Sequence, residues 1–156
     1  MTKMHDYETT IRWTGNRGQG TKTYQGYDRK WDLSGEGKPV VSCSNDPLLG
    51  GDSTKYNPED ILLAAVASCH MLWYLHLASD AGITVLGYED DPVGHGESEA
   101  SGAGRFTGAT LRPRITVAAG TDLARADAIH REIHKVCFIA RSVAFPVAFE
   151  ARYVIG

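Results

Sequence analysis

The spacing of apolar and polar residues changes along the chain, and each change predicts a different kind of secondary structure. Apolar and polar positions alternate over residues 7–13, which is the period of a half-buried strand. Strand-like runs follow at 22–31 and 38–44, and glycine-containing turns separate the three runs. The first third of the chain therefore predicts an antiparallel meander.

The next segment has the spacing of a long helix. Asn57 is a favourable N-cap, proline follows at the first helical position, and two acids occupy the first turn. Gly82 favours termination, so we expect a helix from Asn57 to about Asp80. Apolar residues cover nearly every side of this helix, which predicts that it is buried. We do not expect a membrane span, because Asp60 and three further polar residues interrupt the apolar run.

The remainder of the chain alternates between strand-like and helix-like spacing. Pro113 lies inside a strand-like run, which favours an edge strand or a bulge at that point. This order predicts an α+β fold with a mainly antiparallel sheet, in one domain over residues 1–156, without internal repeats or linkers. The expected elements are a strand at 83–90, a glycine-rich hairpin at 94–108, a strand at 109–119, a helix at 121–145 and a strand at 147–155.

Composition and charge narrow the classes of function. Hydrophobic residues make up 42% of the chain and charged residues 22%, which is ordinary for a globular protein. The formal net charge of -3 argues against a nucleic-acid binder, which normally has a basic face. The first ten residues lack the apolar core of a signal peptide, so we expect a cytoplasmic protein. Three cysteines are too few and too widely spaced for a disulfide framework, so each one packs, binds a metal or reacts.

Cys69, in the middle of the long predicted helix, is the main candidate for chemistry. A lone cysteine on an apolar helix is usually a small buried hydrophobe. Here His70 is adjacent, a second helical cysteine is available at Cys137, and Arg17 lies on a glycine-flanked turn. A nearby cation lowers the pKa of a thiol and so raises its thiolate fraction. These features together favour thiol redox chemistry.

The segment around Cys137 allows more than one interpretation. On a continuous helix, His130, His134 and Cys137 would lie along one stripe, which suits a zinc-type site. Alternatively, Cys137 is a resolving cysteine, and the two histidines either tune its pKa or are simply exposed on an amphipathic helix. Cys43 lies in a short strand without a charged neighbour, and we interpret it as structural.

Three segments together resemble the OsmC/Ohr family, the osmotically inducible and organic hydroperoxide resistance proteins. They are TGNRGQG at 14–20, NPEDILLAAVASCHM at 57–71 and HKVCFIARSV at 134–143. The expected order of strands and helices is also similar to that family over essentially the whole chain. The run from Asn-Pro-Glu through a long helix to Ala-Ser-Cys is the most specific of these features.

The resemblance implies a thiol-dependent peroxidase that reduces organic or inorganic hydroperoxides in oxidative stress defence. It implies that Cys69 is the peroxidatic cysteine and Cys137 the resolving one, that Arg17 pairs with the thiolate and that Glu59 holds the arginine. It also implies an OsmC-like fold in an intertwined homodimer with two active sites at the interface. An external dithiol, lipoyl-type or other, would restore the enzyme, and no bound cofactor is required.

Two alternatives to the peroxidase remain from the sequence. One is a stress-response protein that keeps the fold but binds a small ligand or a metal in the interface pocket. The other is a protein in which both cysteines belong to the core.

The spacing along the helix also bears on the predicted dimer. Glu59 and Cys69 are ten residues apart, or ~15 Å along a straight helix. A carboxylate cannot approach a thiol of its own helix over that distance. Either the long side chain of Arg17 bridges the gap, or Glu59 serves the cysteine of the other subunit, and we favour the second.

Overall fold

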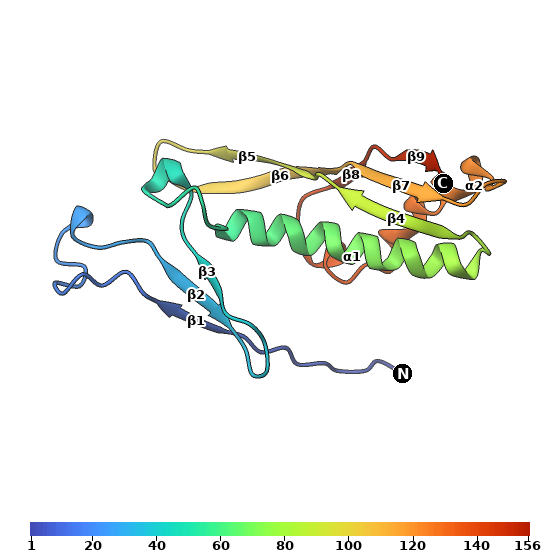
Figure 1. Ribbon diagram of the computed structural model, residues 1–156. Helices are drawn as coiled ribbons and strands as arrows, with labels where there is room; N and C mark the ends of the chain where they lie inside the picture. The colour runs from blue at the N-terminus through green and yellow to red at the C-terminus, as the bar shows by residue number, and fades with distance from the viewer. The chain divides into compact units, whose positions relative to one another are not determined.

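The computed structural model describes all 156 residues (Figure 1). Its contacts gather in two compact units, and the single domain expected over residues 1–156 stays a prediction. The first unit is Met1–Ile61 and the second is Leu62–Gly156. Each is described below by itself. The α+β class and the mainly antiparallel pairing predicted from the sequence are both present.

The first unit contains the predicted meander. Strands β1 (Thr10–Trp13), β2 (Trp31–Ser34) and β3 (Val41–Cys43) form an antiparallel sheet in the order β1-β2-β3. Trp31 of β2 lies opposite Trp13 on one side and Cys43 on the other. The strands are shorter than the alternating runs that predicted them.

The strand expected over 22–31 is wrong for most of its length, because a local cluster replaces the sheet pairing. Tyr24–Gly26 form a 3₁₀ turn, and regular pairing begins only at Trp31. The guanidinium of Arg29 lies over the rings of Tyr24 and Tyr27, 4.1 and 4.3 Å from their centres. It also donates hydrogen bonds to the main-chain oxygens of both tyrosines. These short-range contacts hold the segment in a turn.

Helix α1 (Pro58–Asp80) begins and ends where the sequence predicts. The side chain of Asn57 accepts a hydrogen bond from the N–H of Asp60, and the side chain of Asp60 accepts one from the N–H of Asn57, which forms a reciprocal capping box. At the other end Gly82 has a φ of 70°, a left-handed conformation, and the N–H of Ile83 donates to the oxygen of Ala78. Glycine is favoured there because it has no Cβ.

Only one face of α1 is buried, which corrects the expectation that the helix is covered on all sides. Its outer face is partly open, and the side chain of Leu72 is 61% exposed. By length and composition alone α1 could cross a membrane. The polar side chains on it and the packing of its inner face are those of a core helix. The buried residues, at intervals of about four, are Val66, Ala67, His70, Tyr74 and Ala78.

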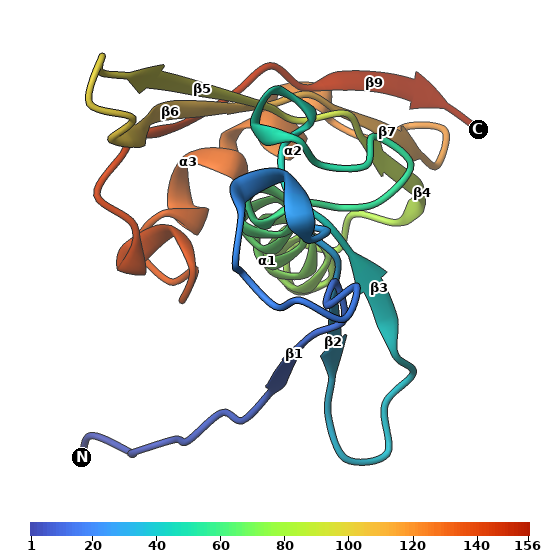
Figure 2. The ribbon, with the colours of Figure 1, turned by 90° about the vertical axis from the view of Figure 1, so that its left-hand side faces the viewer.

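The second unit packs α1 and two short helices against one side of a row of strands (Figure 2). Two three-stranded sheets, ordered β4-β7-β9 and β5-β6-β8, are joined where only Arg112 separates β6 from β7. The glycine-rich hairpin predicted for this region is confirmed as the β5–β6 pair. The strands are β4 (Val85–Asp90), β5 (Val93–Ser98), β6 (Gly104–Leu111), β7 (Pro113–Val117), β8 (Val147–Phe149) and β9 (Arg152–Ile155).

One expectation about these strands is wrong, and one of the two alternatives for Pro113 is excluded. The single strand expected at 147–155 is interrupted after Phe149, so that β8 pairs with β6 and β9 pairs with β7, both in parallel. Pro113 is not on an edge strand, because β7 lies between β4 and β9. It is instead the first residue of its strand. A proline can occupy this position although it has no N–H to donate to a neighbouring strand.

The second helix is shorter than expected and is interrupted. It consists of α2 (Leu123–Ala128), with Asp122 as N-cap, and α3 (His130–Ile133). The N–H groups of Lys135 and Val136 donate to oxygens three residues earlier, which tightens the turn and ends the helix. A 3₁₀ turn at 140–142 replaces the rest of the expected helix.

Candidate functional site

Cys69 lies on the side of α1 that faces the core, next to the fully buried stripe. Its side chain is half-buried and packs against the larger apolar cluster of the second unit. That cluster includes Tyr74 from α1 and Ile115 from β7. The helix therefore presents this thiol at the edge of the core, where it keeps some access to solvent.

Cys137 lies in the turn after α3 and is fully buried. Its N–H donates to the oxygen of Ile133 at 2.8 Å, and its Sγ accepts a hydrogen bond from the N–H of Ala140 at 3.4 Å. Burial, with the contact to Cys69 as a second cause, raises the pKa of the Cys137 thiol to about 11. Cys137 is therefore protonated at neutral pH.

The fold brings these two cysteines into contact. The thiol of Cys137 donates to the Sγ of Cys69, with the sulfurs 2.8 Å apart. A disulfide bond is ~2.05 Å long, and both cysteines are free thiols. The thiol of Cys69 is thus partly accessible, whereas the thiol of Cys137 is buried and protonated. A short displacement would bring the two sulfurs to bonding distance, as thiol–disulfide chemistry requires.

Arg17 and Glu59 both belong to the first unit, where they do not pair with each other. Asn16 fixes the turn by accepting hydrogen bonds from the N–H groups of Gly18 and Gly20, at 2.9 Å each. The Arg17 guanidinium is half exposed, donates to the main-chain oxygen of Gln25 and lies 3.7 Å from the carboxylate of Asp28. Glu59 is exposed in the first turn of α1. The role that the resemblance gives these two residues stays a prediction.

The structure adds a pair of histidines that the sequence did not reveal. His70 Nε2 and His130 Nδ1 lie 2.8 Å apart, and the two side chains are almost completely buried. The ring of His130 stacks against Tyr74 and Phe149, with centres 4.4 and 4.8 Å apart. Burial lowers the pKa of His70 to about 4, and burial together with the neighbouring His70 and Arg131 lowers that of His130 to about 3. Both imidazoles are neutral at physiological pH.

The zinc-type stripe of His130, His134 and Cys137 does not form, because the helix that would have aligned them ends at Ile133. His130 points into the core toward His70, whereas His134 is exposed. No three histidine, cysteine or acidic side chains are gathered as metal ligands. The third cysteine, Cys43, is buried in the first unit with the main-chain oxygen of Val41 at 3.5 Å, as a structural residue would be.

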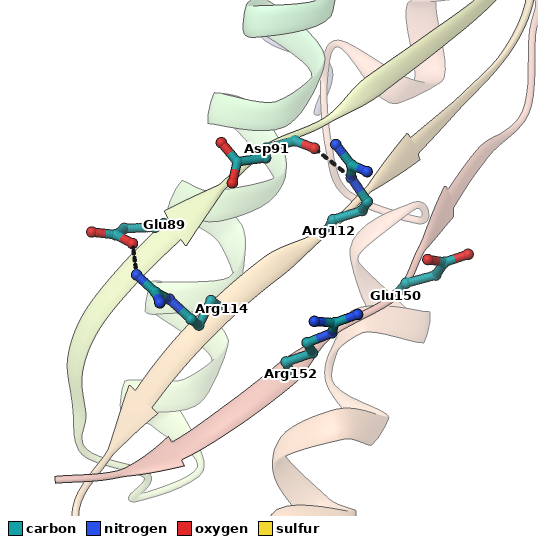
Figure 3. A pocket seen from close by; sticks show the side chains of 6 residues that line it. All are labelled: Glu89, Asp91, Arg112, Arg114, Glu150 and Arg152. Carbon is teal, nitrogen blue, oxygen red and sulfur yellow. Dashed lines mark hydrogen bonds and ion pairs between the residues drawn. The ribbon is translucent and has the colours of Figure 1, made fainter.

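A depression of about 380 Å³ lies on the outer face of the β4-β7-β9 sheet (Figure 3). Glu89, Arg114 and Arg152 stand side by side across its three strands, and Arg114 is hydrogen-bonded to Glu89. Side chains alternate between the two faces of a strand, so the neighbours Ile115 and Tyr153 point toward the core instead. No thiol or histidine lines this depression, and its exposed, mixed charges are those of a solvated sheet face.

The chain is similar to OsmC-like proteins both in sequence and in fold. Residues 50–152 match the family model of OsmC-like proteins. An OsmC-like protein of unknown function from Vibrio cholerae is 26% identical and superposes with a TM-score of 0.84, over 96% of this chain and 100% of that one. No curated protein matches the chain in sequence.

Two proteins named for organic hydroperoxide resistance share the fold at lower identity. The one from Elizabethkingia anophelis is 14% identical with a TM-score of 0.70, and the alignment covers 100% of both chains. The one from Bacillus subtilis is 18% identical with a TM-score of 0.61, over 94% of this chain and 96% of that one. These similarities show a common fold.

Proposed function

The chain belongs to the OsmC-like protein family, and from this premise we propose that it is a cysteine-based peroxidase that reduces organic hydroperoxides. The observation that carries the proposal is the contact of 2.8 Å between the sulfurs of Cys69 and Cys137. The names of two proteins of the same fold, which refer to organic hydroperoxide resistance, support the choice of substrate class.

The difference between the two thiols assigns their roles. The half-buried Cys69 attacks the hydroperoxide as a thiolate, the O–O bond breaks, and the alcohol leaves with a proton from solvent while the sulfur becomes a sulfenic acid. Cys137 has kept its proton, since burial raises its pKa to about 11. Its sulfur then bonds to that of Cys69, and the sulfenic hydroxyl leaves with the thiol proton as water. An external dithiol, of the lipoyl type or another, reduces the disulfide by exchange.

Rapid mixing of the reduced protein with cumene hydroperoxide, followed by thiol counting, tests this proposal. We expect the loss of two thiols per chain, with the third, Cys43, unchanged. A small-ligand binder or a protein with two core cysteines would keep all three thiols, and that result would contradict the proposal. Repetition with hydrogen peroxide ranks the two substrate classes.

We assign Arg17 the role of the cation that stabilises the Cys69 thiolate, with Glu59 as the residue that holds it. Its present contacts, to the Gln25 oxygen and to Asp28 at 3.7 Å, are surface contacts that a thiolate can replace. Arg17→Gln is therefore expected to slow thiol oxidation at neutral pH without changing the number of thiols lost. The matched control is Arg12→Gln, at an exposed arginine of β1. Equal rates in the two variants would exclude this role.

We propose that the active form is a homodimer in which Glu59 serves the cysteine of the other subunit. The partly exposed apolar face of α1, including Leu72, supports an interface between copies of the chain. Mixing inactive Cys69→Ser chains with inactive Glu59→Ala chains tests the arrangement, because one of the two sites in a mixed dimer is then complete. If the subunits exchange and no activity returns, Glu59 does not act in trans.

A further inference from the structure

Beside the histidine pair the second unit contains a cavity that is separate from the thiols. Its volume is about 230 Å³, and neither Cys69 nor Cys137 lines it. Its apolar wall is formed by four side chains of α3, of the turn that follows and of β8: Ile133, Ala140, Val147 and Phe149. A cavity of ~150 Å³ can hold benzene, so this space accepts a somewhat larger molecule with one ring or a short branched chain.

The polar part of the cavity carries no negative charge. Its polar lining consists of His70, His130, Arg131 and His134. Arg131 is largely exposed, and its one ion pair is a loose contact of 3.6 Å with Asp127. The charge at the mouth is therefore positive, and it favours an anionic ligand over a neutral or a cationic one.

One lining residue, His130, has a ring nitrogen that is covered by its neighbours and has no partner. His130 is 2% exposed, and its Nε2 makes no hydrogen bond. Its other ring nitrogen is occupied by His70, and the stacking on Tyr74 and Phe149 prevents the ring from turning. In the tautomer in which His70 donates to Nδ1 of His130, the proton of the neutral His130 ring lies on Nε2. Nε2 is then a hydrogen-bond donor without an acceptor. A buried donor of this kind destabilises the folded protein until an acceptor reaches it.

We propose that this cavity is a binding site for a small apolar monocarboxylate, such as an aryl or branched aliphatic acid. The carboxylate is held at the mouth by Arg131, and it accepts a hydrogen bond from His130 Nε2 once the side chains that cover this atom move aside, while the apolar body contacts Val147 and Phe149. The site does not depend on the proposed peroxidase activity, because binding is measured on the reduced protein without peroxide.

Titration of the wild-type protein with benzoate, followed by calorimetry and by nitrogen NMR of the histidine rings, tests the proposal. We expect saturable binding in the millimolar range or tighter, with a shift of the Nε2 resonance of His130. Benzyl alcohol has the same ring without the charge and is expected to bind at least tenfold more weakly. Equal binding of the alcohol, or no saturation by benzoate, would overturn the proposal.

Variants locate the site. Arg131→Gln removes the charge at the mouth and is expected to weaken benzoate binding about tenfold, which corresponds to ~1.4 kcal/mol. Arg131 is exposed, so this variant does not put folding at risk. The matched control is Arg141→Gln, an exposed arginine that does not line the cavity, and it should bind benzoate as the wild type does. If both variants weaken binding equally, benzoate is held by general surface charge, and the proposal is wrong.

Discussion

The buried histidine pair should make the protein sensitive to mild acid. Below neutral pH the unfolded chain binds protons at His70 and His130, whereas the folded chain resists protonation because both rings are buried. The pKa of each ring in the folded protein, about 4 and about 3, is depressed below the ordinary value of 6.5. The stability that this difference contributes is therefore full above pH 6.5 and is lost as the pH falls toward 4.

The size of the effect follows from proton linkage. At pH 5 protonation of the unfolded chain is favourable by about 2 kcal/mol for each histidine, and at pH 7 by only ~0.2 kcal/mol. Protonation of the folded chain is negligible at both values, so the pair should lower the free energy of unfolding by about 4 kcal/mol between pH 7 and pH 5. That is a large part of the ~5–15 kcal/mol that stabilises a typical domain.

The assay is urea unfolding at pH 7 and pH 5, on the wild type and on His70→Leu/His130→Phe. Removing both partners avoids an unpaired imidazole, and phenylalanine keeps the stack with Tyr74 and Phe149. The double variant should lose about 4 kcal/mol less than the wild type over this range. Burial raises the pKa of Asp90, which acts in the opposite direction, but equally in both proteins.

A control keeps the comparison specific. His76→Gln replaces an exposed histidine of the same helix and should keep the wild-type pH dependence. If the wild type and the double variant lose the same stability between pH 7 and pH 5, the histidines are not buried as a neutral pair.

Three further predictions concern the thiols and the ends of α1. Cys137→Ser should leave Cys69 as a persistent sulfenic acid after one equivalent of peroxide, which a dimedone probe detects. The control Cys43→Ser should form the disulfide as the wild type does. If Cys137→Ser forms no sulfenic acid, Cys137 is not the resolving cysteine. Asn57→Ala breaks the capping box and should lower the free energy of unfolding by about 1 kcal/mol. Gly82→Ala forces a residue with a Cβ into a left-handed conformation, and it should lower the free energy of unfolding by ~1–2 kcal/mol in the same denaturant assay. Unchanged unfolding midpoints in Asn57→Ala and Gly82→Ala would contradict the geometry of the helix ends.

The sequence predicts α1 well because its signals are local. Asn57, the acids of the first turn and Gly82 each act within one helical turn, so neighbouring residues suffice to place both ends. The second helix was predicted too long for the opposite reason. Its apolar spacing continues past Ile133, but hydrogen bonds to oxygens three residues earlier end the helix, and the spacing does not encode that change.

The chemistry of the second unit was only partly predictable. Helical spacing and family resemblance both pointed to Cys69 and Cys137, and the fold places their sulfurs in contact. The pairing of His70 with His130, sixty residues apart, depends on packing between separate elements. A signal was nevertheless present, because His70 lies four residues from Val66 and from Tyr74 and thus on the buried stripe of α1.

The most direct test of the thiol mechanism is the chemical state of the three cysteines after one turnover. The reduced protein is treated with one equivalent of cumene hydroperoxide without a reductant, alkylated, digested and analysed by mass spectrometry. We predict that Cys69 and Cys137 are recovered in one disulfide-linked peptide pair and that Cys43 is alkylated. Recovery of all three cysteines as alkylated thiols, with the peroxide unconsumed, would contradict the account.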